Sequence, residues 1–488
     1  MMSVESESTF QLDRSEITST AIRSLRRAIV CVVLVVGALS ANGRCQSWAP
    51  EFISLEAAIP VLQGMAGSLP PELKAAGPQL NSQTWAAWVQ KEDADIRKRL
   101  DRGEEDTLTN LLRFGVTFTK EYPIDREYLS LYGHSTLVDS FAENRANDLI
   151  RALQSPSANE GMKEMRLWLE KKGFSFKTGS ERARVKKYLL ANLARERDEF
   201  NAYREKLRTA DVTERSHLYA ERGISLDTNL WPDYALDTAL RQLLEKGLLK
   251  PGGVRRIAIV GPGLDFANKD YGNDFYPPQT IQPFAVMDSL ARLGIADPKS
   301  LELFTLDISS NVNLHVQRAK KAALAGKSYT VQLPWNSAVP WSQEYLANFT
   351  KYWQALGDQI GTSTAPVAVP VPVARDVHVR AVTIRPPIVA RITPLDMNVV
   401  FQRLPISKPD QQFDLIIGTN IFIYYGAFEQ SLARANLSSM LRPGGFLLSN
   451  DFLADKVPSK LTEVQKTILK VSLQPEITEY VFCYQREH

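Results

Sequence analysis

This chain of 488 residues contains few of the side chains that most often bind metals or form nucleophilic triads. It has three cysteines and five histidines, the histidines are scattered, and there is no Cys-x-x-Cys pair. The sequence therefore predicts neither a structural zinc site nor a histidine-based triad. Gly-x-Ser-x-Gly, P-loop and His-Glu-x-x-His motifs are also missing, which argues against the hydrolases, nucleotide triphosphatases and metallopeptidases that use them.

An excess of charge of one sign is missing too. The 58 basic and 55 acidic residues give a net charge of +3, and no basic run is interleaved with aromatic residues. We therefore expect no nucleic-acid partner. The content of 44% hydrophobic and 23% charged residues is typical of a globular protein, and the length leaves room for two domains and a tail.

No apolar run reaches the roughly 20 residues that a transmembrane helix needs, so no stable transmembrane span is predicted. Three arginines at positions 23, 26 and 27 precede the short apolar run Ala28–Leu39, and small residues follow it. This order is typical of a secretory signal. We expect an exported protein, periplasmic or secreted, if the signal is genuine, and a cytoplasmic one if the run is instead a buried amino-terminal helix.

Two of the three cysteines would remain after cleavage of such a signal, Cys45 and Cys483. They could form a disulfide in an oxidising compartment. The alternative is a free thiol at position 45 and a buried thiol on a late strand.

The chain divides into three parts by pattern. Residues 1–45 form the targeting segment, and residues 46–232 form an all-helical domain, in which leucines such as Leu108, Leu111 and Leu112 keep helical spacing. Residues 233–488 form an α/β domain with an insertion at about 310–393. We expect Gly173, Gly247 and Gly294 to end helices.

The α/β domain is predicted from short apolar runs that end in glycine, acid, amide or aromatic residues. Buried parallel strands look like this when their carboxyl ends line a ligand crevice. We therefore expect a Rossmann-like, mostly parallel sheet with helices on both faces, with MNVVFQRL (Met397–Leu404) as its third strand. The other runs are RRIAIVGPGLDF (Arg255–Phe266), LELFTLDIS (Leu301–Ser309), FDLIIGTNIFIYY (Phe413–Tyr425) and LRPGGFLLSND (Leu441–Asp451).

In their order and residue pattern, these runs resemble class I S-adenosylmethionine-dependent methyltransferases. The Asn-x-x-x-Tyr-Tyr pattern of Asn420–Tyr425 is most similar to the chemotaxis-receptor methyltransferases. The resemblance covers about residues 233–487 outside the insertion, and it implies that Ile477–Glu487 forms the last, antiparallel strand. It also implies S-adenosylmethionine as cofactor and a methyl acceptor, small molecule or protein, that the sequence does not identify.

The resemblance implies cofactor-binding roles for residues at the strand ends. The glycine turn would pass beneath the methionine and ribose parts of the cofactor, and an acid at the end of the second strand would accept hydrogen bonds from the ribose hydroxyls. Catalytic residues stay unassigned, since methyl transfer depends mainly on orientation. The assigned positions are Gly261, Gly263 and Asp265 at the turn, Asp307 for the ribose, Gln402 for the adenine amino group, Asn420 for the methionine end and Tyr424 at the mouth.

The glycine turn departs from the family pattern. Ile259 replaces the usual acid, Phe266 replaces the third glycine, and the inserted stretch Asn268–Thr280 delays the helix, for which Thr280 would be the N-cap. The acids and aromatics of this stretch, Asp270 to Tyr276, could contact substrate or cofactor, or could form a surface Ω-loop. Trp231 and Tyr234, in turn, could line the pocket or belong to the core.

Three functions remain open at this point. The first is a methyltransferase. The second is an exported, non-catalytic protein that uses the same scaffold for binding or structure, since S-adenosylmethionine is kept in the cytosol whereas the signal would place the chain outside. The third is a dinucleotide-binding oxidoreductase, against which Asn-x-x-x-Tyr-Tyr and the Pro-Gly-Gly turn at residues 443–445 argue.

Overall fold

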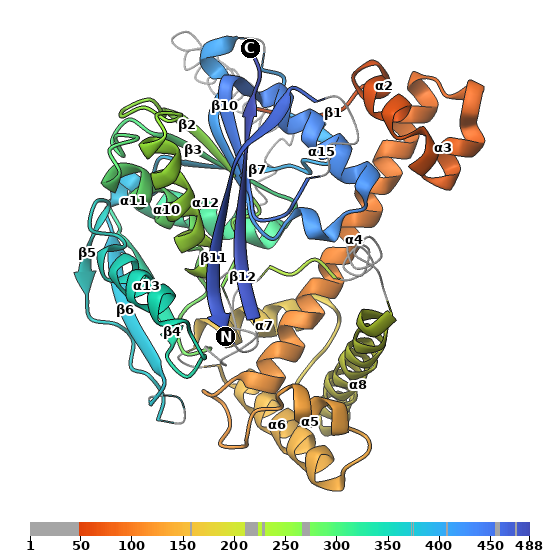
Figure 1. Cartoon of the computed structure of the whole chain (residues 1–488). Coiled ribbons are helices and arrows are strands. Elements are labelled where there is room, and N and C mark those ends of the chain that lie inside the picture. The colour runs from red at the N-terminus through yellow and green to blue at the C-terminus, as the bar shows by residue number, and fades with distance from the viewer. Residues whose placement is uncertain are drawn as a thin grey trace, which may run out of the picture. The chain divides into compact units, whose positions relative to one another are not determined.

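The computed structural model (Figure 1) describes residues 48–156, 159–209, 223–226, 230–265, 274–371, 373, 375–406, 408–453, 459–473 and 476–488. The apolar run at 28–39 and Cys45 lie outside these ranges, so the signal segment and the Cys45–Cys483 disulfide stay predictions. Cys483 itself is fully buried on a late strand, and burial raises the pKa of its thiol to about 12. In the part of the chain that the structure describes, no helix is both long and apolar enough to cross a bilayer.

The amino-terminal region is helical, as predicted. Its longest helix, α4, starts at a capping box in which Asn81 accepts from the amides of Gln83 and Thr84. Leu108, Leu111 and Leu112 of α4 pack with α6, α7 and α8 in one apolar cluster. The helices are α2 (Leu55–Gly64), α3 (Pro71–Ala76), α4 (Ser82–Phe114), α5 (Arg126–Leu131), α6 (Thr136–Gln154), α7 (Glu160–Lys171) and α8 (Gly179–Thr209).

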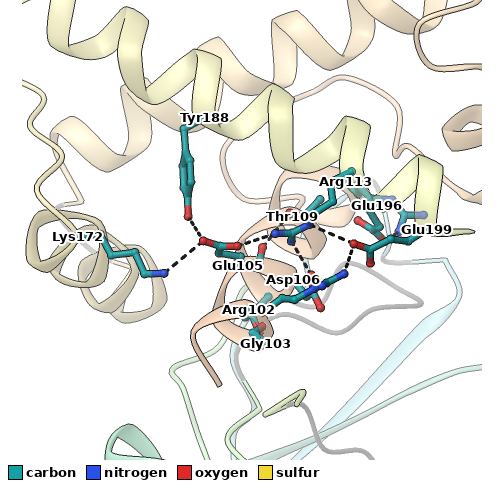
Figure 2. Close-up of polar contacts among 12 residues, drawn as sticks. Arg102, Gly103, Glu105, Asp106, Thr109, Arg113, Lys172, Tyr188, Glu196 and Glu199 are labelled. Atoms are coloured by element: carbon teal, nitrogen blue, oxygen red, sulfur yellow. Dashed lines mark hydrogen bonds and ion pairs between the residues drawn. The ribbon is translucent and has the colours of Figure 1, made fainter. Parts of the chain in front are cut away.

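Ion pairs fix α4 between α7 and α8, as Figure 2 shows. The carboxylate of Glu105 accepts from Tyr188 Oη at 2.7 Å and from Arg195 Nη1 at 2.6 Å, and Lys172 Nζ lies 3.3 Å from it. Arg113, which is buried, donates to Glu196. These pairs are partly desolvated, so screening by water and salt weakens them less than exposed pairs. They therefore stabilise the packing of the second half of α4 against α7 and α8.

The second half of the chain contains a seven-stranded sheet in the order β11-β12-β10-β9-β2-β3-β7. Strands β7, β3, β2, β9 and β10 are parallel, whereas β12 runs antiparallel to both β10 and β11. The antiparallel last strand is the one that the resemblance implied, at Ile477–Glu487. The strands are β2 (Arg256–Val260), β3 (Glu302–Asp307), β7 (Ile392–Asp396), β9 (Phe413–Gly418), β10 (Leu441–Ser449), β11 (Leu461–Leu473) and β12 (Glu476–Arg486).

Helices cover both faces of this sheet (Figure 1). On one face α10 (Leu230–Glu245), α11 (Gln282–Arg292) and α12 (Ser310–Leu324) share a large core with alternate strand residues. On the other lies α15 (Ala427–Met440), whose Leu432, Leu437 and Met440 are fully buried. The predicted Rossmann-like fold, preceded by a helical region, is confirmed.

The prediction for the third strand was wrong. The strand beside β3 is β7, Ile392–Asp396, and the segment Met397–Leu404 follows it. Its apolar residues, Val399, Val400 and Phe401, are buried and lie in a turn. Asn398 stabilises this turn by accepting a hydrogen bond from the Val400 amide. Burial without strand pairing explains the error, because a short apolar run predicts burial more securely than conformation. Gln402–Arg403 forms β8, which pairs with β1 (Glu51–Phe52) in a separate two-stranded sheet.

The predicted insertion contains α12, which connects β3 to a small antiparallel sheet in the order β4-β6-β5. Helix α13 (Gln343–Ala355) packs aromatic residues against this unit and against α10; Tyr234 contacts Tyr345, Phe349 and Tyr352. The core alternative for Tyr234 is therefore the one observed. The strands are β4 (Tyr329–Asn336), β5 (Gly361–Thr364) and β6 (Val377–Ile384), and the short helix α14 (Pro386–Val389) follows.

Glycines end three helices as predicted: Gly173, Gly247 and Gly294 have φ of 82°, 70° and 69°. The predicted N-cap Thr280 is wrong. Helix α11 starts at Gln282 after Ile281, and no side chain caps it. The hydroxyl of Thr280 donates instead to Pro262 O at 3.3 Å, so it ties the glycine turn to the start of the helix.

Candidate functional site

The glycine turn follows β2 at the carboxyl edge of the sheet. Gly261 and Gly263 have φ of 62° and 71°, values that side chains disfavour, and the Gly261 amide donates to Leu306 O of β3 at 2.9 Å. A Cβ atom on Gly261 would lie 2.1 Å from Ile421 Cδ1. The close approach at Gly261 is therefore made by a side chain of the loop after β9.

Asp265 closes the inserted loop. Its backbone exchanges two hydrogen bonds with Gln279, at 2.7 and 3.0 Å, and its Oδ2 accepts from Gln279 Nε2 at 3.2 Å. Gln279 also donates to Gln332 O of β4 at 2.8 Å. Asp265 is 3% exposed, so in this structure its carboxylate stabilises the base of the inserted loop through its hydrogen bond to Gln279. A role in cofactor binding stays a prediction.

The described end of the inserted loop is anchored to the helical region. Asp274 accepts from the Val116 amide at 2.9 Å and from Thr117 Oγ1 at 2.7 Å, and burial raises its pKa. The next residues, Phe275 and Tyr276, line a cavity of about 490 Å³ with residues of α6 and α7. Asp270 and Tyr271 lie outside the described residues.

Asp307 ends β3 beside Asp396, which ends β7 in register with it. Asp307 is 7% exposed and its Oδ1 accepts from the Ser309 amide at 2.7 Å. Burial raises the pKa of its carboxyl to about 7, with a further increase from Asp396 and an opposing effect from Arg97. Sequence reasoning missed Asp396, because it placed the third strand too late and so found no acid after it.

Gln402 does not share this edge of the sheet. Its side-chain Oε1 accepts from the Asn398 amide at 2.8 Å, and its backbone pairs with Phe52. The prediction that Gln402 lies at the carboxyl end of the third strand is therefore wrong. Asp396 ends that strand, and Asn398 follows it.

Helix α4 contacts the ends of β3 and β7 through Arg97. Its guanidinium donates to Asp396 Oδ1 at 2.7 Å, to Ile308 O at 3.2 Å and to Asp93 Oδ2 at 3.0 Å. Asp93 in turn accepts from Asn398 Nδ2 at 2.8 Å. A charged helix face shows no sequence signal for such a contact, so the sequence did not predict it.

The loop after β9 contains Asn420, the one non-glycine residue with positive φ (58°) in the described part of the chain. Its amide donates to Asn450 Oδ1 and its Oδ1 accepts from Asn450 Nδ2, both at 2.7 Å. Asp451 accepts from the amides of Phe422 and Ile423, at 2.8 and 3.2 Å. The end of β10 thus holds the Asn-x-x-x-Tyr-Tyr segment in place.

The two tyrosines of this segment differ in exposure. Tyr424 is half-buried, whereas Tyr425 is buried. Arg99 of α4 interacts electrostatically with this segment: burial lowers the pKa of its guanidinium, and Tyr425, Glu429 and Tyr424 oppose that effect.

Helix α10 contributes a buried acid beneath the same loop. Gln282 Nε2 donates both to Asp233 Oδ1 at 3.2 Å and to Thr419 Oγ1 at 2.8 Å, next to Asn420. Asp233 is 2% exposed, its Oδ2 has no hydrogen-bond partner in the structure as described, and burial raises its pKa to about 7. Trp231, at the start of α10, is half-buried and lies against Trp341 with ring centroids 4.0 Å apart.

The strand ends thus bring together Gly261, Gly263, Asp307 and Asn420, with Tyr424 nearby in sequence, whereas Asp265 faces the inserted loop and Gln402 lies in another sheet. Opposed to them are Arg97 and Arg99 of α4. This edge offers backbone amides, two neighbouring carboxyls and aromatic rings.

No family model and no curated protein matches this chain. Among solved structures it is similar to TrmN from Thermus thermophilus, with 13% identity and a TM-score of 0.25, over 52% of this chain and 52% of that one. It is also similar to the N-methyltransferase NodS from Bradyrhizobium japonicum WM9 in complex with S-adenosyl-L-homocysteine. The identity is 12% and the TM-score 0.26, over 59% of this chain and 99% of that one. A third similar structure is the magnesium protoporphyrin IX methyltransferase ChlM from Synechocystis PCC 6803 with bound SAM. The identity is 9% and the TM-score 0.25, over 59% of this chain and 97% of that one.

This chain spans about half the length of TrmN. The fold assignment rests on the strand order and on the antiparallel β12, and similarity at this level of identity concerns the fold alone. The strand order therefore gives this chain a Rossmann-like fold, with a helical region before it.

Proposed function

We propose that this chain is an S-adenosylmethionine-dependent methyltransferase. The observation that supports the proposal best is the position of Asp307, whose carboxyl ends β3 beside the glycine turn and opposite the Asn420 loop. An acid at this point of a parallel sheet can accept hydrogen bonds from vicinal ribose hydroxyls. The similarity of Asn420–Tyr425 to the chemotaxis-receptor type is the finer part of the proposal.

The residues present fit an adenosyl group at the end of β3. One oxygen of Asp307 accepts from Ser309, and Asp396 adds a second carboxyl in register beside it. When bound, the cofactor would supply an activated methyl group on sulfur. This chain would bind the cofactor, orient the acceptor and exclude water. At Gly261 a ligand would contact Ile421, whose terminal methyl now lies there.

Titration calorimetry of the full chain with S-adenosylmethionine and with S-adenosylhomocysteine tests this proposal. We expect micromolar binding that Asp307→Ala abolishes and that Asp410→Ala, a change at an exposed acid, leaves intact. NAD in the same titration tests the oxidoreductase alternative. If the well-folded wild-type protein binds neither methionine compound, the enzyme proposal fails.

The second candidate is an exported protein that uses the scaffold without catalysis. It is favoured by Arg97, which already bonds Asp396 and Ile308 O at the adenine end of the predicted site, and by the predicted signal at residues 28–39. Arg97→Ala distinguishes the two candidates. Tighter cofactor binding by this variant would mean that α4 only restricts a working site, whereas no binding by either protein supports the scaffold.

A further inference from the structure

A cavity of about 240 Å³ lies between α2, α15 and the open end of the β11–β12 pair. Pockets for drug-sized molecules usually have about 300–1,000 Å³, so this cavity suits a smaller ligand. Three basic residues and four serines line it together with small apolar side chains of α2. No carboxylate is among the described residues that line it, so the cavity has the composition of an anion site.

This cavity lies at the edge of the sheet opposite the glycine turn. Arg486, near the end of β12, pairs with Leu461 at the start of β11. Its Nη1 donates to the carbonyl of Leu441, the first residue of β10. Gly261, by contrast, follows the carboxyl end of β2, and β2, β9 and β10 are parallel. The cavity is therefore separate from the candidate cofactor site.

Two cations that line the cavity have no acidic partner within the described residues. Nε of Arg486 is buried without a hydrogen-bond partner there, and burial alone lowers the pKa of its guanidinium. Lys460 is exposed and lines the same cavity. The two residues meet at the strand ends, where the Glu487 amide donates to Lys460 O at 2.7 Å. A partly desolvated cation is costly unless an anion accompanies it.

Arg434 of α15 contributes a third positive charge to the wall. It is 3% exposed and donates through Nε to Ser459 Oγ at 2.6 Å and through Nη1 to Leu453 O at 2.9 Å. Its Nη2 donates to Leu461 O. These bonds fix the guanidinium between α15 and the start of β11.

Ser438 adds a hydroxyl that makes no hydrogen bond within the described residues. It is 6% exposed and lines the cavity. Two other serines of α15 differ from it, because Ser431 Oγ donates to Ala427 O at 2.8 Å and Ser439 Oγ to Asn436 O at 2.6 Å. A nearly buried hydroxyl without a partner carries a desolvation cost that an acceptor on a ligand would remove.

We propose that this cavity binds a phosphate oxyanion, either free or as the phosphomonoester of a small molecule. A phosphomonoester has close to two negative charges at neutral pH and three strong acceptor oxygens. These match the two cations Lys460 and Arg486 and the donor hydroxyl of Ser438, whereas a carboxylate would bring a single charge. Ala57 and Pro60 of α2 would contact the carbon part of an ester. The site does not depend on the proposed function.

Titration calorimetry of the full chain at neutral pH and fixed ionic strength, without cofactor, tests the site. The probes are inorganic phosphate, phenyl phosphate and benzoate. We expect the wild-type protein to bind phenyl phosphate about tenfold more tightly than benzoate, because the phosphate has more charge and more acceptors. Ser438→Ala and Lys460→Gln should each weaken phenyl phosphate binding about three- to tenfold. Lys470→Gln, at an exposed lysine of β11 outside the cavity, should leave it unchanged.

Three results would overturn the proposal: no binding of either phosphate by the wild-type protein, equal affinity for benzoate and phenyl phosphate, or wild-type affinity in both cavity variants. The two side chains have no described partners to lose, so both variants should fold normally, as thermal melts would show. A preference for phenyl phosphate over inorganic phosphate would identify a phosphorylated molecule that contacts α2. Equal affinity for these two probes would identify free phosphate as the ligand.

Discussion

Asn420 and Asn450 exchange two hydrogen bonds of 2.7 Å between the ends of neighbouring parallel strands, amide to Oδ1 in one direction and Nδ2 to Oδ1 in the other. Asn420 needs this support, because its φ of 58° is a left-handed conformation that non-glycine residues adopt at a cost. The two hydrogen bonds thus connect the Asn-x-x-x-Tyr-Tyr segment to the end of β10.

Asn450→Ala should lower the free energy of unfolding by about 1–2 kcal/mol, because the Asn420 amide and side chain each lose a partner. Asn420→Gly should cost less, since glycine adopts this φ without strain and keeps the amide bond to Asn450 Oδ1. Urea unfolding of the three proteins measures both effects. Equal stability of wild type and Asn450→Ala would mean that the exchange does not stabilise the loop.

Gly261→Ala should destabilise the protein by roughly 2–3 kcal/mol, since the new methyl group would both meet Ile421 Cδ1 and occupy a left-handed backbone. Ile421→Ala in the same chain should restore part of the loss by removing the clash. A double-mutant cycle in urea isolates this term. Additive effects of the two substitutions would contradict the contact between the glycine turn and the Asn420 loop.

The sequence predicted the parts of the fold that have local signals. Apolar runs ending in Gly261, Asp307 and Asn420 identified three strands and the edge at which their ends meet, and glycines at helix ends identified the stops. The third strand was misplaced, because Ile392–Asp396 is short and half-exposed whereas the buried turn at 397–401 is more apolar. Hydrophobicity reports burial, and in this segment burial and strand pairing do not coincide.

The polar contacts across long sequence separations could not be predicted. Arg97 and Asp396 are 299 positions apart by their numbers, and nothing in the charged pattern of α4 distinguishes an arginine that meets a strand end from one that meets water. The same holds for Asp233 and Thr419, which Gln282 connects. Such contacts depend on the docking of whole helices, which periodicity does not specify.

The pKa of the Asp307 carboxyl should shift in opposite directions in two variants. Asp396→Asn removes a neighbouring negative charge and should lower the Asp307 pKa below its value of about 7, whereas Arg97→Ala removes an opposing cation and should raise it. Carbon-13 NMR of labelled aspartate measures both pKa values. Shifts of the same sign in the two variants would contradict the arrangement at the ends of β3 and β7.

Asp233 should make the protein less stable as the pH rises through 7. Its folded pKa of about 7 lies above the ordinary 3.8, so the folded state binds the proton more tightly than the unfolded state. Its contribution is therefore complete below pH 4 and is lost as the pH passes the folded value. Between pH 5.5 and 8 the loss should be about 2 kcal/mol.

Asp233→Asn removes this ionisation while its amide oxygen can still accept from Gln282. The variant should therefore gain stability relative to wild type at pH 8 and gain less at pH 5.5, as urea unfolding at the two pH values would show. Asp410→Asn is the matched control, because Asp410 is exposed and should show no such difference. A stability difference between Asp233→Asn and wild type that is the same at both pH values would mean that Asp233 is not protonated in the folded state, and that the acid beneath the Asn420 loop is charged.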